Sequence, residues 1–178
     1  MIYKRTFLNL CCGGVEGLAI ATQRCQLYLL PVDSQGRDLS SLYPVVRASA
    51  RGDFFKRDFT QRRLTHGEWW YATGGQIYQF SVLYGCFENG NSLEDFIFKA
   101  CEKVIPYEAK KLCLPLRIYL SGEGVSYEDS YRQIMPGVKK CLDSRLPGTF
   151  EEITFFAVGQ TLPAGVGKFF GRIFDNQV

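Results

Sequence analysis

Glycine and small polar residues gather in two short segments of this chain that could bind an anion. The first segment covers residues 13–19, Gly-Gly-Val-Glu-Gly-Leu-Ala, and the second covers residues 121–125, Ser-Gly-Glu-Gly-Val. A glycine-rich turn before a helix presents several backbone N–H groups and the positive end of the helix dipole, which together favour a phosphate. Two such turns in one small chain predict a cleft that holds a diphosphate from two sides.

The elements around both segments are those that such a cleft requires. Residues 2–10 and 114–120 are apolar and predict buried strands that lead into the two glycine segments. A helix is expected to follow each of them, over residues 18–25 and from Ser126 onward. Ser126 and Asp129 have the spacing of a capping box, and Pro136-Gly137 is expected to kink or interrupt the second helix.

The rest of the chain alternates between strand and helix patterns. Strands are predicted at 27–32, 69–73, 76–87 and 152–158, with a turn at 33–36 and a hairpin at Gly74-Gly75. A helix is predicted from the N-cap Ser92 to a stop near Pro106, with one apolar stripe along it. This order predicts an α/β fold in which helices cover a sheet through right-handed crossovers. The tail, residues 159–178, is expected to pack back on the domain or to dock on a partner.

Catalytic chemistry has few candidates. Glu123 and Asp129 are weak candidates for a general base, because Asp129 already has a capping role and Glu123 would face a bound phosphate. The single histidine, His66, has no recognisable nucleophile context, which favours a structural or surface role. Residues 164–168, Ala-Gly-Val-Gly-Lys, lack the first glycine and the final Ser or Thr of a nucleotide-binding P-loop.

Composition and charge narrow the classes of protein and the kinds of site that this chain could have. The chain has 178 residues, a formal net charge of +3 and one histidine, and we expect one domain. Its 7 cysteines form no Cys-x-x-Cys pair, so we expect neither a metal site nor a cofactor, but reduced thiols in a cytoplasmic protein. No apolar run is long enough to cross a bilayer, and we expect no signal peptide and no membrane partner. Residues 47–63 hold 6 basic and 2 acidic residues and could face an anionic partner.

Several of these segments together resemble the macro domain, the ADP-ribose-binding α/β/α module. Residues 17–21, Gly-Leu-Ala-Ile-Ala, resemble its first ligand loop, and Gly67-Glu68 before the predicted hairpin resembles a step typical of the family. The helix from Ser92, the loop at 121–125 and the last strand with Phe155-Phe156 fall in the corresponding places. The resemblance implies a three-layer α/β/α fold with a mixed central sheet, formed by residues 1–178.

The resemblance also implies roles for particular residues. Backbone groups of the two loops would hold the diphosphate, and Phe156 would offer an aromatic face to the ligand. Ser126 stands where some hydrolytic members carry an Asp. The implied ligand-binding residues are Gly13, Gly14, Val15, Gly17, Ala19, Ser121, Gly122, Glu123, Gly124, Val125 and Phe156.

Three functions follow as hypotheses. The first is binding of ADP-ribose or a related phosphate-containing nucleotide, free or attached to a protein. The second is a ligand-free macro-like module for protein or RNA interaction, with RNA bound through residues 47–63. The third adds a weak ADP-ribosyl hydrolase activity that acts through Glu123 or Asp129.

Overall fold

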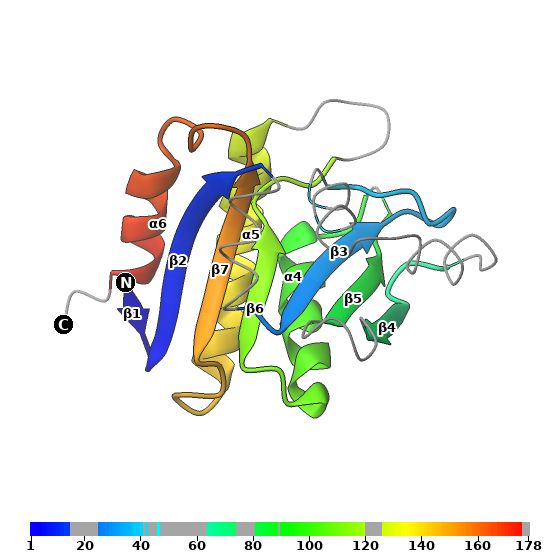
Figure 1. The fold of residues 1–178 in the computed structure, drawn as a ribbon, viewed down its shortest axis with the longest axis horizontal. Helices are drawn as coiled ribbons and strands as arrows, with labels where there is room; N and C mark the ends of the chain where they lie inside the picture. Colours follow the sequence, from blue (N-terminus) through cyan, green and yellow to red (C-terminus); the bar gives the residue numbers. More distant parts are fainter. Residues whose placement is uncertain are drawn as a thin grey trace.

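A mixed sheet forms the centre of the molecule. The computed structural model describes residues 1–14, 25–40, 42, 46, 64–73, 81–88, 90–119 and 126–175. Its 7-stranded sheet has the order β1-β2-β7-β6-β3-β5-β4 (Figure 1). The strands are β1 Ile2–Tyr3, β2 Thr6–Gly13, β3 Leu27–Val32, β4 Trp69–Thr73, β5 Ser81–Cys86, β6 Lys111–Pro115 and β7 Glu152–Val158.

Five strands in the middle of the sheet run parallel, and the two edge strands run antiparallel to their neighbours. β2, β7, β6, β3 and β5 pair in parallel, while β1 pairs with β2 and β4 pairs with β5 in the antiparallel sense. All six residues of β3 are buried, as expected for a parallel strand covered on both faces. The predicted α/β fold with a mixed central sheet is therefore confirmed.

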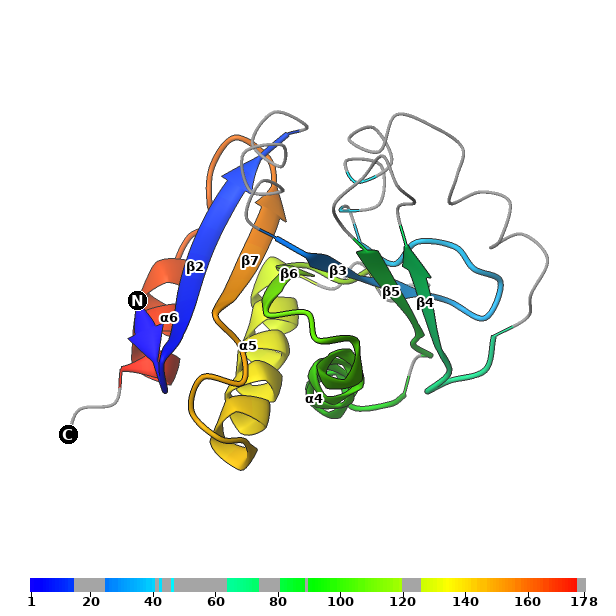
Figure 2. The same ribbon diagram turned by 60° about the horizontal axis from the view of Figure 1, so that its bottom comes forward.

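Helices cover one face of this sheet. α4 (Leu93–Val104) and α5 (Tyr127–Ser144) pack against each other beneath it, and α6 (Val166–Phe174) lies beside α5 under β2 and β7 (Figure 2). A short 3-10 turn, Ile105–Tyr107, follows α4. Phe155 of β7 meets Phe170 and Phe174 of α6 with ring centroids 5.9 Å apart in both pairs. The apolar side chains of α6 are thus packed against the sheet.

The opposite face of the sheet carries a second apolar cluster. Because side chains alternate along a strand, Leu27 and Leu29 face the helices while Tyr28 and Leu30 face the other way. The second cluster also contains Leu42, Val46 and Leu64, which lie outside the strands, together with Phe156 of β7. Burial on both faces accounts for the aromatic and aliphatic richness of the central strands.

The predicted caps of both long helices are confirmed. The Ser92 Oγ accepts a hydrogen bond from the Asp95 N–H at 3.1 Å, and the Ser126 Oγ accepts one from the Asp129 N–H at 3.1 Å. The six residues of the stripe predicted on α4 are all buried. The predicted strands at 27–32 and 152–158 and the turn at 33–36 are confirmed as well.

Two sequence predictions about local structure are wrong in their bounds. Residues 2–10 form two strands rather than one, because Lys4 and Arg5 turn the chain with positive φ values of 45° and 65°. The strand predicted at 114–120 runs from Lys111 to Pro115 instead. Proline has no N–H for a ladder bond, and the chain leaves regular pairing after it. The second hairpin strand is described only from Ser81.

Helix α5 is not interrupted at Pro136-Gly137, so the interruption, one of the two outcomes predicted there, is wrong. It continues to Ser144 because buried residues on both sides of Pro136, among them Ile134, Met135 and Val138, fix it against the sheet and α4. Tertiary packing of this kind outweighs the single backbone hydrogen bond that proline removes. Gly137 is buried where α5 packs against α4, and an added Cβ there would lie 2.5 Å from the Glu94 carbonyl oxygen, so glycine permits this close contact.

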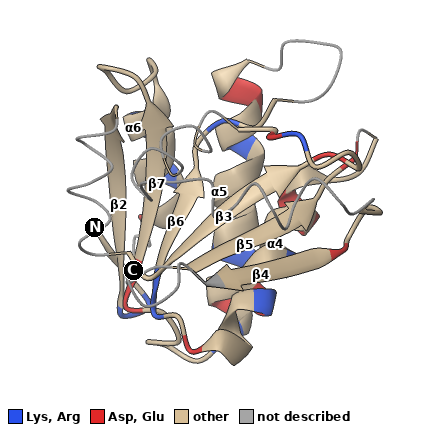
Figure 3. Ribbon diagram, turned by 45° about the vertical axis from the view of Figure 1, so that its right-hand side comes forward, with Lys and Arg blue, Asp and Glu red and all other residues tan. Residues whose placement is uncertain are grey.

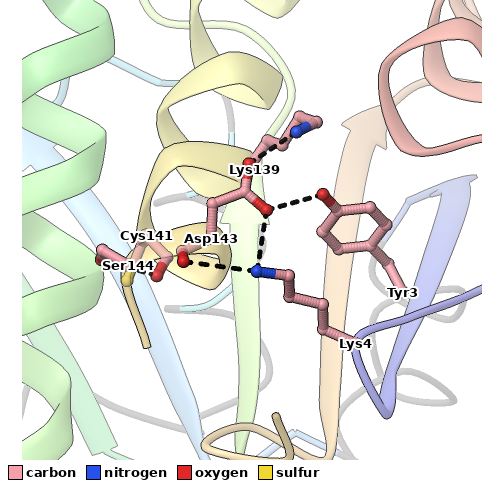
Figure 4. A network of polar contacts seen from close by, with 6 residues as sticks. All are labelled: Tyr3, Lys4, Lys139, Cys141, Asp143 and Ser144. Carbon is pink, nitrogen blue, oxygen red and sulfur yellow. Dashed lines mark hydrogen bonds and ion pairs between the residues drawn. The ribbon is translucent and has the colours of Figure 1, made fainter. Parts of the chain in front are cut away.

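A polar cluster ties the first hairpin to the end of α5. The Tyr3 hydroxyl donates to Asp143 Oδ1 at 2.6 Å, and Lys139 Nζ lies 2.5 Å from Asp143 Oδ2 (Figure 4). Lys4 Nζ lies 3.3 Å from Asp143 Oδ1. Burial opposes ionisation, but the hydrogen bonds from Lys139, Tyr3 and Lys4 lower the pKa of Asp143 below its usual value. The edge strand β1 is therefore held by a side-chain cluster as well as by β2.

Some sequence predictions fall on residues outside those the structure describes. These are the helix at 18–24, the Gly74-Gly75 turn and the basic segment 47–63. Across the described residues, no helix is both long and apolar enough to cross a membrane.

Candidate functional site

The carboxyl edge of the parallel strands is the candidate site. In parallel α/β sheets, ligands bind outside the carboxyl ends of the strands, where the loops to the next helices begin. β2, β3, β4 and β5 contain no charged residue, and those of β6 and β7, Lys111 and Glu152, stand at the amino ends. Charged side chains lie on helices and connections instead (Figure 3). An anion at this edge would therefore meet backbone donors rather than strand carboxylates.

The first predicted loop leaves this edge from β2. Gly13 ends the strand opposite Val158 of β7, and the Gly13 carbonyl accepts a hydrogen bond from the Gly159 N–H at 3.2 Å. Gly14, the next residue, is exposed, and a Cβ added to it would meet no atom within 4 Å. The chain thus enters its loop with an open approach to the backbone.

The second predicted loop leaves the same edge on the other side of β7. The Leu116 N–H donates to the Phe156 carbonyl at 2.9 Å, and the Tyr127 hydroxyl donates to the Val158 carbonyl at 3.3 Å. The chain then reaches Tyr119, whose N–H donates to the Leu39 carbonyl beyond β3, and the start of α5 at Tyr127 lies near the end of β7. Since β2 and β6 each neighbour β7, the strand ends that lead into the two loops are separated by roughly 10 Å, twice the usual strand spacing.

Arg117 adds a positive charge at this edge that sequence analysis missed. Its guanidinium carbon lies 4.5 Å from the ring centroid of Tyr119 and 4.8 Å from that of Tyr127. Two aromatic rings thus orient a side chain that is suited to phosphate recognition. The residue was assigned to a strand over 114–120. The signal that could have placed it was Pro115, which rarely continues a central strand.

The remaining predicted ligand residues divide into two groups. Phe156 is 1% exposed and packs in the second apolar cluster, opposite Cys11 of β2 in the strand register. Its predicted contact with a ligand stays a prediction. The loop residues that lie outside the described part of the chain are Val15, Gly17, Ala19, Ser121, Gly122, Glu123, Gly124 and Val125.

The described acidic residues next to the second loop already have partners. Asp129 accepts a hydrogen bond from the Ser126 hydroxyl at 2.7 Å, and Glu128 Oε1 lies 2.5 Å from Arg132 Nη2. His66 Nδ1 accepts a hydrogen bond from the Glu88 N–H at 3.2 Å, remote from the loops in sequence. Glu123 lies outside the described residues. The two acidic residues described beside the second loop are therefore both engaged in local contacts.

One thiol at this edge, that of Cys86, is poorly reactive near neutral pH. Cys86 ends β5, where burial raises the pKa of its thiol to about 11, so the reactive thiolate is scarce near neutral pH. Within the described ranges, no group of three or more His, Cys, Asp or Glu side chains is arranged to hold a metal ion.

Comparison with known proteins bears on the fold of the chain. No protein-family model matches the sequence, and no curated protein matches it. Solved structures match it closely in fold, and they show that the chain has the macro domain fold.

Three of these structures illustrate the likeness. The macro domain of ganglioside induced differentiation associated protein 2 has a TM-score of 0.74 and 15% identity, covering 100% of this chain and 90% of that one. The Trypanosoma brucei macrodomain in complex with ADP has a TM-score of 0.64 and 15% identity, covering 94% and 68%. A mutant of the Oceanobacillus iheyensis macrodomain has a TM-score of 0.65 and 9% identity, covering 96% and 94%.

Proposed function

We propose that this protein binds ADP-ribose or a related nucleotide diphosphate at the carboxyl edge of its sheet. The observation that supports the proposal is the position of β2 and β6, the strands that precede the two glycine segments: both end at one edge of the sheet, on either side of β7. Backbone N–H groups of residues 13–19 and 121–125 would donate to the diphosphate, and Arg117 would supply a nearby charge. Macrodomains of the same fold have been solved with ADP and with ADP-ribose, which supports this choice of ligand.

Binding is proposed without hydrolysis. Asp129 is engaged by the cap residue Ser126, and a carboxylate that already accepts a hydrogen bond from a hydroxyl at 2.7 Å is poorly placed to activate water. A docking role for the tail is also disfavoured, because Phe169, Phe170 and Phe174 of α6 are buried against the domain itself. Nucleotide binding is therefore the function that the described residues support best.

The test is calorimetric titration of ADP-ribose into the wild type and a Gly14→Val variant. The empty space at the Gly14 Cβ position means that valine fits the protein alone, while its side chain would occupy the approach to the loop backbone. We expect at least about tenfold weaker binding, because ligand contacts to backbone donors at a loop of this kind are lost together.

A matched control is Gly167→Val, since Gly167 also has no atom within 4 Å of an added Cβ and lies on α6. This variant should bind ADP-ribose like the wild type. The proposal fails if the wild type gives no heat at millimolar ADP-ribose, or if both glycine variants bind as the wild type does.

A further inference from the structure

A basic groove lies between the first turns of α5 and α6. It encloses about 330 Å³, and its walls come from the first turns of α5 and from residues 164–172. Three cationic side chains line it, Arg132 of α5 and Lys168 and Arg172 of α6. Glu128 is the acidic residue in the lining, and it pairs with Arg132.

The cations converge on one aromatic ring. The guanidinium carbons of Arg132 and Arg172 lie 5.3 Å and 5.1 Å from the ring centroid of Phe169, which is itself only 9% exposed. The Phe169 ring is thus in contact range of two like charges, one from each helix. Lys168 and Arg172 also stand four residues apart on α6, a spacing at which like charges repel.

This arrangement costs stability unless an anion is present. Three cations and one carboxylate leave two positive charges facing a concave space, where low-dielectric walls focus the field. The charged residues are exposed at the rim of the groove, and the buried rings of Tyr131 and Phe169 form its floor. We propose that this groove binds a phosphomonoester, whose charge near pH 7 is about −1.5 to −2 and so matches the lining.

The two net positive charges of the groove favour a phosphomonoester over a phosphodiester, because a diester carries only one negative charge. The volume exceeds that of one phosphate group, and the apolar wall of Tyr131, Ala164 and Phe169 would accommodate the group that carries it. The ligand is therefore a terminal phosphate, either on a small carrier or on a nucleotide. The residues that line this groove do not include any of those assigned to the ADP-ribose cleft proposed above.

The test is an NMR titration of the full chain, following backbone amide shifts, with methyl phosphate, dimethyl phosphate and 5′-AMP as separate probes. Methyl phosphate or 5′-AMP should shift the amides of residues 128–132 and 164–172. Tighter binding of 5′-AMP would identify a nucleotide as the carrier, and equal binding would identify the bare phosphate as the recognised group. Dimethyl phosphate should bind at least tenfold more weakly.

The double variant Lys168→Gln/Arg172→Gln should weaken methyl phosphate binding at least tenfold and leave ADP-ribose binding unchanged. Its matched control is Lys99→Gln/Lys103→Gln, an exposed pair with the same spacing on α4, which should bind as the wild type does. Glu128→Gln should strengthen binding severalfold, because it removes the competing carboxylate, and misfolding could not produce such a gain.

The assignment is overturned if neither monoester shifts the groove amides at 10 mM, or if dimethyl phosphate binds as tightly. It is also overturned if both double variants lose affinity equally, if Glu128→Gln weakens binding, or if methyl phosphate shifts only residues 13–14. None of these results would change the outcome of the Gly14→Val test, so the two proposals fail separately.

Discussion

Replacing Gly137 with alanine should destabilise this protein, although alanine is the better helix former. Gly137 lies inside α5 where that helix meets α4. A Cβ at this position would lie 2.5 Å from the Glu94 carbonyl oxygen and 3.0 Å from the Ile97 Cβ. The first of these is a backbone atom, which cannot rotate away, so α4 and α5 would have to separate.

The size of the effect follows from two opposing contributions. Overpacking a well-packed core costs about 1–3 kcal/mol, and a contact with backbone places this case toward the upper end. Alanine in place of glycine in a helix returns about 1 kcal/mol. We therefore expect a net loss of about 2 kcal/mol, which for a protein of this length lowers the Tm by about 4–8 °C.

Gly171→Ala in α6 is the matched control. The atom nearest to its added Cβ is Asp175 Oδ2 at 3.6 Å, an ordinary contact with a movable side chain. This variant keeps the propensity gain of about 1 kcal/mol without the clash, so its Tm should rise by about 2–4 °C. Urea unfolding followed by circular dichroism measures both variants, and the reasoning is refuted if Gly137→Ala is as stable as the wild type.

Two further predictions concern ionisable groups. Because the folded pKa of Asp143 lies below its unfolded value of about 3.9, its carboxylate stabilises the protein above that pH, and this contribution disappears as the pH falls through the folded pKa. Asp143→Asn should therefore lower the free energy of unfolding, measured in urea near neutral pH, by no more than about 1 kcal/mol. The variant should also lose less of this free energy than the wild type does as the pH falls into the acid range. An identical dependence of the free energy of unfolding on pH in both proteins would contradict this. Cys86 should resist alkylation in the folded protein near pH 8 and react once urea unfolds it, because burial raises the pKa of its thiol to about 11. Peptide mapping by mass spectrometry measures the labelling. Alkylation of Cys86 in the folded protein would disprove this.

Local signals in the sequence were sufficient to predict those helices and strands whose bounds depend on one pattern of neighbouring side chains. The buried runs at 27–32 and 152–158 gave the strand bounds that the structure has, and Ser92 and Ser126 marked the first turns of α4 and α5. The resemblance to the macro domain is confirmed at the level of the fold. These features depend on neighbours a few residues apart, which the sequence displays directly.

Local signals misled where distant contacts override them. Pro136 is a helix breaker in isolation, but the burial of its neighbours between α4 and the sheet keeps α5 intact. The apolar run 114–120 looks like one strand, yet it ends at Pro115, which leaves Arg117 at the carboxyl edge between two tyrosine rings. The two-strand hairpin at residues 2–13 depends on a Lys-Arg turn that has no sequence signature.

By itself, the sequence determined the types of element, their order and the presence of two glycine segments of anion-binding character. Only the tertiary structure decided that β7 lies between β2 and β6, which brings the roots of both segments to one edge. Likewise, only the tertiary structure decided that Arg132 of α5 lines the same groove as Lys168 and Arg172 of α6. The physical reason is that strand order and helix packing depend on contacts between residues far apart in the chain, and residue spacing along a sequence carries no direct record of those contacts.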